Sequence, residues 1–342
     1  MKNFRVLKTV KSKRIISGFS MKNLGVILLF LLLFPYLVTF LFGNLQEGSA
    51  EKSVQVSTED QLADGQYQIK NQTELGAESI PLEIYVADKL ARVAEADWEI
   101  EALKAQAVLI RTGLFWQLDQ KTGNKEGLKV SEEAIASQDH KMTIEVEDEL
   151  YGSMPVSDAV YQAVAETAGV CILYQDSPIV GAYFAVSTGA TRNSEELGLA
   201  DYPYLKSVLC SRDFLAEGYS SSIEVEENKF WQIWESISET AVTTAGTEEE
   251  GMTYRRDNAG YVLSLEYKGK RVSGESFRQA YGIDSACFHL SKEKGNVIIT
   301  VKGKGHGLGM SQYGARQLAA EGKTCIEIIE YFFNDVTIAK IE

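Results

Sequence analysis

The stretch Ile100-Glu-Ala-Leu-Lys-Ala-Gln-Ala-Val-Leu-Ile-Arg-Thr-Gly-Leu-Phe-Trp116 is the strongest structural signal in this chain. Its residues are mostly good helix formers. Apolar side chains recur at helical spacing along one face, at Leu103, Ala107, Ile110 and Leu114. The stretch therefore predicts a long helix with one buried face.

Two further helices are predicted around this one. Pro81 suits the first turn of a preceding helix, whose apolar positions are Leu82, Tyr85, Val86, Leu90 and Val93. Ser157 suits the N-cap of a following helix, with Val160, Val164 and Ala168 on its buried side. The period then changes to two, and residues 170–175, a turn at 176–178 and residues 179–186 predict a β-hairpin.

The C-terminal half alternates between short helices and strands. Helices are predicted at residues 230–235, 311–321 and 324–332, and strands at 261–267, 270–272 and 296–302. Residues 244–251 are acidic and predict a solvated loop. The whole indicates an α+β fold, a single ectodomain of helices with mostly antiparallel strands, preceded by one transmembrane helix.

The N-terminus predicts a membrane anchor. Residues 1–23 carry seven cations and no acid, and residues 24–43 are twenty residues without a charge, enough to cross a bilayer. This pattern places a basic tail in the cytoplasm, residues 24–43 in the cell membrane as a single pass, and the rest outside. Residues 44–77 are polar and predict a stalk, and residues 78–342 the ectodomain. A cleaved signal peptide is the alternative.

Charge and cysteine content exclude other classes. Subtracting the seven N-terminal cations from the net charge of −14 leaves −21 for the remaining residues, which argues against nucleic-acid binding. The four cysteines form no CxxC pair, and three histidines give a metal site little to build on, so no metal and no cofactor are expected. Buried thiols are the simplest interpretation of the cysteines, with one or two disulfides as the alternative.

Three segments of the sequence follow one another in a recognisable order. The opening is Pro81-Leu-Glu-Ile-Tyr-Val86 followed by Glu101-Ala-Leu-Lys-Ala-Gln-Ala-Val-x-x-Arg-Thr112. The middle is Ala163-Val-x-x-Thr167-x-Gly169 and Tyr183-Phe-x-x-Ser187-x-Gly-x-Thr191. The closing is Gly305-His-Gly-Leu-Gly-Met-Ser-Gln-Tyr-Gly-Ala315, preceded by Ser273-Gly-Glu-Ser-Phe-Arg278. Together these segments resemble the SpoIID/LytB family of cell-wall proteins, and the resemblance covers residues 78–342.

The resemblance implies a role in sporulation. The family includes lytic transglycosylases that act with an amidase during engulfment, cutting glycan strands from which the amidase has removed the peptides. One carboxyl group serves as acid and then as base, while the C6 hydroxyl of the sugar attacks. The implied partners are peptidoglycan glycan strands, a cell-wall amidase and other engulfment proteins.

The catalytic position departs from the family pattern. The family's glutamate lies eight residues before the Glu-Ala-Leu-Lys run, and here that position is Val93. Glu95 could replace it if the helix ends near Val93, and otherwise it is an exposed loop acid. Ala185, Ala190 and Lys304 also stand where the family commonly has histidine, glycine and tryptophan.

The remaining candidate site residues come from the three segments. His306, between two glycines before a helix capped by Ser311, is expected to face a ligand. The alternative is that Gly305, Gly307 and Gly309 only serve a tight turn. Lys104, Gln106 and Arg111 are either ligand-binding residues or helix-surface residues, and Ser187 and Thr191 either bind sugar hydroxyls or cap a turn. Ser311 and Gln312 complete the predicted substrate-binding set.

Three functional hypotheses follow. The first is a wall-binding and remodelling protein that does not cut, the second an active lytic transglycosylase with a relocated acid such as Glu95, and the third a non-enzymatic envelope scaffold. Val93 separates the first two, and retention of the closing loop separates both from a scaffold.

Overall fold

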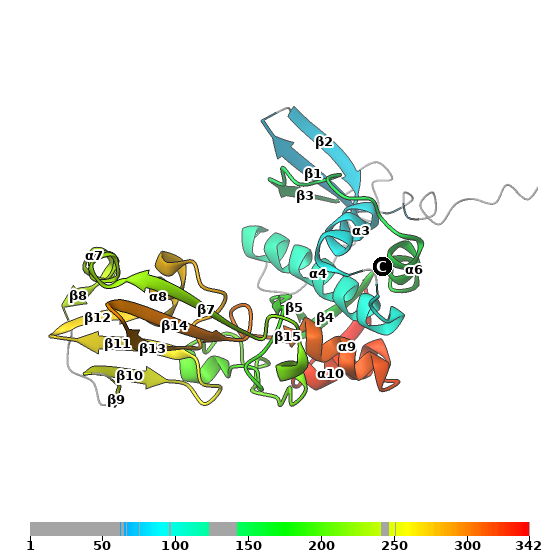
Figure 1. The fold of residues 1–342 in the computed structure, drawn as a ribbon. Helices are drawn as coiled ribbons and strands as arrows, with labels where there is room; N and C mark the ends of the chain where they lie inside the picture. The colour runs from blue at the N-terminus through cyan, green and yellow to red at the C-terminus, as the bar shows by residue number, and fades with distance from the viewer. Residues whose placement is uncertain are drawn as a thin grey trace, which may run out of the picture. The chain divides into compact units, whose positions relative to one another are not determined.

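Helix α4 (Ile100–Thr122) is the central element of the fold (Figure 1). Its predicted face, Leu103, Ala107, Ile110 and Leu114, belongs to one apolar core. Its other side, with Ala105, Val108 and Leu109, belongs to a second core, so the middle of the helix is buried all round. The computed structural model describes residues 67–74, 76–95, 97–122, 142–240, 246–249 and 251–341, with Leu62 and Gly65.

Four helices pack against α4, and all four were predicted from the sequence. They are α3 (Leu82–Val93), α6 (Asp158–Glu166), α9 (Gln312–Ala320) and α10 (Cys325–Phe332). Pro81 stands at the N-cap of α3, one residue before the predicted first turn. The Ser157 side chain accepts a hydrogen bond from Val160 N, and Thr324 and Glu327 form a capping box on α10.

The N-terminal edge of the fold differs from the predicted stalk. Residues 67–77 lie in the stretch predicted as stalk, yet β1 (Tyr67–Thr73) and β2 (Gly76–Pro81) form a sheet with β3 (Met142–Val146). Strand β1 pairs antiparallel with β2 and parallel with β3. The signal is weak because only alternate residues, Tyr67, Ile69 and Asn71, are buried, and the others are polar.

The predicted hairpin at residues 170–186 is confirmed in its first strand but not in most of its second. Strand β4 (Val170–Tyr174) pairs with the short β5 (Ser177–Pro178) and with β16 (Thr337–Lys340). The residues predicted as the rest of the second strand instead form β6 (Tyr183–Phe184), which pairs in parallel with β15 (Met310–Ser311). This pairing brings the middle and closing segments together.

Residues 220–302 form a segment with a core of its own, which we call the 220–302 segment. Its ends meet where Gly303 N donates to Tyr219 O over 2.7 Å. One sheet contains β7 (Ser220–Glu226), β13 (Phe288–Glu293) and β14 (Asn296–Lys302). The other contains β8 (Glu239–Thr240), β9 (Thr247–Glu249), β10 (Met252–Arg256), β11 (Val262–Tyr267) and β12 (Lys270–Ser273).

Helices α7 (Glu227–Ile237) and α8 (Gly274–Tyr281) complete the 220–302 segment. The helix predicted at 230–235 and the strands predicted at 261–267, 270–272 and 296–302 are confirmed. Part of the predicted acidic loop is instead strand β9, because it pairs with β10. Two 3-10 turns, η1 (Ser194–Leu197) and η2 (Asp213–Leu215), precede this segment.

The mixture of helices and largely antiparallel strands confirms the α+β class for residues 56–342, which form one compact unit. No helix among the described residues is both long and apolar enough to span a bilayer. The predicted basic tail and membrane span, residues 1–43, lie outside the described residues, and so does most of the predicted stalk.

Candidate functional site

Helix α3 ends at Val93, the position that the resemblance gives to the catalytic acid. Ala94 follows in extended conformation and donates its N–H to Leu90 O. The Val93 side chain is half buried against the apolar core. Valine offers no proton, so this position cannot supply a general acid.

Glu95 lies beyond the end of α3 and turns toward α9. Its carboxylate accepts a hydrogen bond from Arg316 over 2.7 Å, and the same guanidinium binds Asp97 over 2.8 Å. The side chain of Glu95 is 71% exposed and that of Arg316 only 21%. Because α3 ends at Val93, the structure meets the condition under which Glu95 could replace the missing acid. The Glu95 carboxylate is, however, paired with the Arg316 guanidinium.

The polar residues of the opening segment point mainly into the fold. Arg111, a predicted ligand-binding residue, is fully buried, donates to Glu83 on α3 over 2.5–3.1 Å and donates to Val170 O. A ligand cannot reach it, because its guanidinium joins α3 and α4. Lys104 is paired with Glu101 over 2.7 Å and with Glu166 over 2.6 Å, so it too is held within the protein.

Glu101 and Gln106 connect α4 to the closing segment. Glu101 accepts a hydrogen bond from Cys325 N over 2.7 Å and so caps α10. Gln106 is buried and accepts a hydrogen bond from Gln312 Nε2 over 3.2 Å. Its own Nε2 has no hydrogen-bond partner among the described residues. Both predicted glutamines thus meet, although Gln106 is covered and only Gln312 is half exposed.

Ser187, Thr191 and Ser311 all bind backbone groups; Ser187 caps a turn, one of its two predicted roles, whereas Thr191 bonds to the remote residues 206 and 208. Ser187 Oγ accepts from Gly189 N over 3.1 Å, and Thr191 Oγ1 accepts from Val208 N over 2.9 Å. Ser311 caps α9, as predicted, by accepting from Gly314 N. All three are buried, so none faces a ligand.

Asp213 joins the middle and closing segments and was not predicted. Its Oδ2 accepts hydrogen bonds from Ser187 N over 2.7 Å and from Ser311 Oγ over 2.6 Å. The residue is buried, and burial raises the pKa of the carboxyl group, against the opposing effect of the Ser311 and Ser187 hydrogen bonds. Nothing in its local sequence distinguishes Asp213, since its partners are remote along the chain.

The glycines of the closing loop are required by close packing. Gly307 and Gly309 have φ values of +81° and +77°, which other residues rarely adopt. A Cβ on Gly309 would lie 2.1 Å from Ala182 O, and one on Gly307 would lie 2.6 Å from the Tyr261 ring. The loop is therefore pressed against the middle segment and the 220–302 segment.

His306 is exposed and lies between Gly305 and Gly307. Its Nδ1 accepts a hydrogen bond from Leu308 N over 3.1 Å. Desolvation lowers the pKa of His306, as do Arg278 and Arg192, while a hydrogen bond to the Tyr183 backbone opposes this shift. The lowered pKa favours the neutral imidazole, and the side chain is exposed to solvent.

Arg192 holds this loop in place and was also missed in the sequence. Its guanidinium donates to His306 O over 3.2 Å and to Asp257 over 2.6 Å, and its backbone N–H donates to Gly307 O over 2.8 Å. It also packs over the Tyr261 ring at 4.7 Å. Because Asp257 follows β10, this one arginine connects the closing loop to the 220–302 segment.

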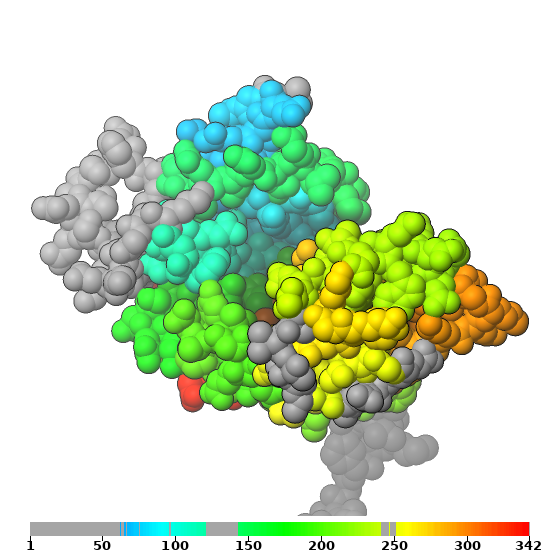
Figure 2. All heavy atoms as spheres, turned by 90° about the vertical axis from the view of Figure 1, so that its left-hand side faces the viewer, coloured from blue at the N-terminus to red at the C-terminus, as the bar shows by residue number. Residues whose placement is uncertain are grey.

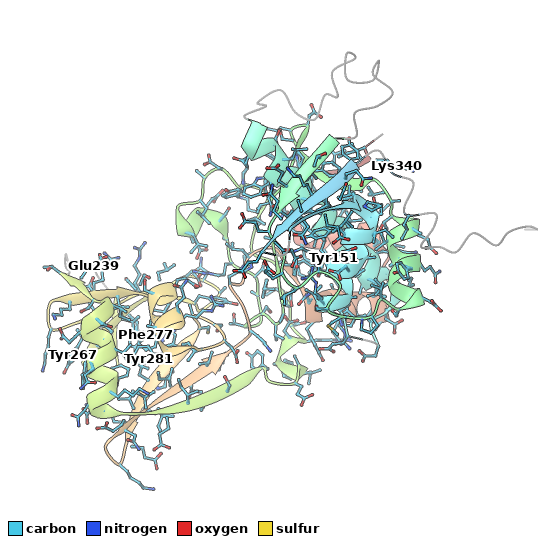
Figure 3. The ribbon with its side chains drawn as sticks, turned by 90° about the horizontal axis from the view of Figure 1, so that it is seen from above. Tyr151, Glu239, Tyr267, Phe277, Tyr281 and Lys340 are labelled. Atoms are coloured by element: carbon cyan, nitrogen blue, oxygen red, sulfur yellow. The ribbon has the colours of Figure 1, made fainter. Side chains whose placement is uncertain are left out.

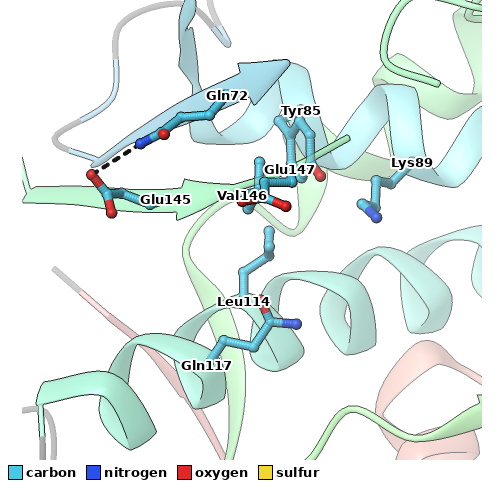
Figure 4. A pocket seen from close by; sticks show the side chains of 8 residues that line it. All are labelled: Gln72, Tyr85, Lys89, Leu114, Gln117, Glu145, Val146 and Glu147. Carbon is cyan, nitrogen blue, oxygen red and sulfur yellow. Dashed lines mark hydrogen bonds between the residues drawn. The ribbon is translucent and has the colours of Figure 1, made fainter. Parts of the chain in front are cut away.

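A separate cavity contains none of the predicted site residues. It has a volume of about 410 Å³ and lies between the β1–β3 sheet and helices α3 and α4 (Figure 4). Its lining is largely polar, namely Gln72, Tyr85, Lys89, Leu114, Gln117, Glu145, Val146 and Glu147. Among the described residues, no three His, Cys, Asp or Glu side chains gather as metal ligands would, and the four cysteines are free.

Comparison with known proteins identifies the family. Residues 70–174 match the family model described as stage II sporulation protein. Stage II sporulation protein D of Bacillus amyloliquefaciens is 31% identical over 269 residues, 78% of this chain and 76% of that protein. The same protein of Bacillus subtilis is 30% identical, over 81% of this chain and 78% of its own length. The chain belongs to the SpoIID/LytB family.

A more distant member is the amidase enhancer of Bacillus subtilis, 24% identical over 71% of this chain and 38% of that protein. The present chain combines two features within the family fold. Valine occupies the acid position, and the closing loop keeps an exposed histidine. The arrangement provides a surface that can contact a ligand, and the Glu95 carboxylate beyond the end of α3 is paired with Arg316.

Proposed function

We propose that this protein is a membrane-anchored, peptidoglycan-binding protein of sporulation, which takes part in wall remodelling during engulfment by holding glycan strands without cutting them. Its relatives named stage II sporulation protein D support the sporulation role. The relative named amidase enhancer supports a cell-wall amidase as partner, beside other engulfment proteins. The anchor would be residues 24–43, which follow seven cations and carry no charge.

One observation carries the proposal: the acid position is Val93, while the closing loop is held by packing contacts and leaves His306 exposed. Lytic cleavage needs a carboxyl group that protonates the glycosidic oxygen, and Val93 has none. The loop contacts that keep His306 exposed, from Arg192 and the packed glycines, do not depend on that acid. Binding can therefore persist where cleavage is lost.

A second candidate, an active transglycosylase, is favoured by the position of Glu95. Helix α3 ends at Val93, and Glu95 follows within reach of Arg316 on α9, the helix that leaves the closing loop. Its ion pair with Arg316 would have to break before the carboxyl group could donate a proton. The proposal therefore favours binding over cleavage.

Digestion of glycan strands distinguishes the binding protein from the active transglycosylase. The full-length chain, purified in mild detergent, is incubated with strands that an amidase has stripped of peptide, and mass spectrometry measures 1,6-anhydro sugar ends. We expect the strands to be bound and no new ends to appear. Ends that appear with the wild-type chain and disappear with Glu95→Gln would show a relocated acid; Glu99→Gln, an exposed acid nearby, is the matched control.

A further inference from the structure

A second pocket lies in the 220–302 segment, outside the residues that match the family model. It has a volume of about 390 Å³ and lies between α7, the β11–β12 hairpin and the β13 end. These elements come together on the face shown in Figure 2, with α7 yellow-green, the hairpin yellow and β13 orange. None of the predicted site residues belongs to it.

Three aromatic side chains line this pocket, Trp231, Trp234 and Tyr267. Trp231 of α7 and Tyr267 of β11 stack with ring centroids 4.7 Å apart and an angle of 24° between the planes. Figure 3 labels Tyr267 beside α7, with Phe277 and Tyr281 in the same part of the molecule. Phe230 and Trp234 are 1% exposed, whereas Trp231 and Tyr267 are only half buried. The stack therefore presents aromatic surface to the pocket.

Charged side chains surround the stack in nearly balanced number. Lys268 lies 5.1 Å from the Tyr267 ring centroid and Lys292 lies 5.9 Å from that of Trp231. Lys292 pairs with Glu227 over 2.6 Å, and Lys270 pairs with Glu235. Three lysines and two glutamates leave a net charge of about +1 by simple counting.

This composition indicates the chemistry of the ligand. Half-exposed aromatic rings gain free energy when an apolar ring face covers them. Ammonium and carboxylate groups at the rim supply both donors and acceptors for hydroxyl and amide groups. A strongly charged ligand would be repelled either by the lysines or by the glutamates of the pocket. A neutral sugar ring, with an apolar face and polar edges, matches all three features, and the volume is that of a small-ligand site.

We propose that the Trp231–Tyr267 pocket binds neutral pyranose rings of a glycan strand, as a second glycan contact apart from the His306 loop. This inference rests on the proposed function for the identity of the glycan. It adds a site in the part of the chain that the family model does not cover. Two separate contacts would let the protein grip a strand without a catalytic centre.

The test is the affinity of the full-length chain for a short, neutral N-acetylglucosamine oligomer, measured by calorimetry. We expect Trp231→Ala to lower the affinity about tenfold or more, since aromatic contacts of this kind contribute roughly a factor of ten beyond area. Trp231→Phe should retain most of it. Trp116→Ala, the same change at a half-buried tryptophan of α4, is the matched control, and circular dichroism checks that each variant folds.

The outcomes are distinguishable. Oligomer binding that is lost in Trp231→Ala but kept in Trp116→Ala supports the pocket. Equal affinity of Trp231→Ala and Trp116→Ala overturns it, even if long strands still bind through the His306 loop. Binding only of carboxylate-bearing strands, weakened by added salt, would also overturn the assignment to neutral sugars. If the wild-type chain binds neither oligomer nor strand, the proposed function itself fails.

Discussion

The polar residues of the family segments and those of the Trp231 pocket differ in their exposure. Arg111 is 0% exposed and pairs with Glu83, which is 11% exposed. Lys292 and Glu227 pair over a similar distance, but their side chains are 50% and 38% exposed. The comparison teaches that a motif residue can serve the scaffold, while residues that belong to no motif can form a surface for a ligand.

The largest expected effect concerns the two ion pairs. Arg111→Met should lower the free energy of unfolding by about 3–5 kcal/mol, because Glu83 is left with a buried, uncompensated charge. Lys292→Met, the matched change in the exposed pair, should cost less than about 1 kcal/mol. Urea unfolding of both variants measures this. Equal losses would contradict the distinction between scaffold and surface.

The pH dependence of stability should differ between two carboxylates, Asp148 and Asp213. Hydrogen bonds from Arg92 hold the pKa of Asp148 well below its ordinary 3.8, with further hydrogen bonding from Tyr85 and despite burial. The stability that Asp148 contributes is therefore present above pH 3.8 and lost as the pH falls through its lowered pKa. Asp148→Asn should cost about 2 kcal/mol at neutral pH and progressively less in acid.

The contribution of Asp213 to stability should change with pH in the opposite direction. Burial raises its pKa above 3.8, so its carboxylate costs stability as the pH rises through and above that value. The stability of the Asp213→Asn variant relative to the wild type should therefore increase as the pH rises. Unfolding midpoints of both asparagine variants across a pH series measure the two slopes. Slopes of the same sign would contradict the assigned environments.

The sequence predicted those parts of the fold that depend on local signals. Helices α3, α4, α6, α9 and α10 have apolar faces that can be read from nearby residues, and α6, α9 and α10 also begin at a capping Ser or Thr. Residues 183–184 were correctly predicted as strand, but their partner was misassigned because β15 lies about 130 residues away and leaves no local pattern. Strand β1 was missed because its exposed positions made the stretch read as a polar stalk.

The site was predicted less completely for the same reason. The exposure of His306 follows from a local feature, the alternation with glycine. The burial of Arg111, Ser187 and Ser311 depends on remote carboxylates: Glu83 lies 28 positions from Arg111 and Asp213 lies 98 positions from Ser311. Residue type alone cannot distinguish a side chain that binds a sugar from one that binds a buried carboxylate.

The central claim is that the closing loop contacts glycan through His306. The smallest of the predicted effects, a loss of glycan binding in a His306 variant, tests this claim most directly. Binding of the full-length chain to amidase-stripped glycan strands is measured for the wild type, for His306→Ala and for the matched control His289→Ala, another exposed histidine. We predict a loss of about three- to tenfold for His306→Ala, the size of one ligand contact, and none for His289→Ala. Unchanged binding by His306→Ala would contradict the account.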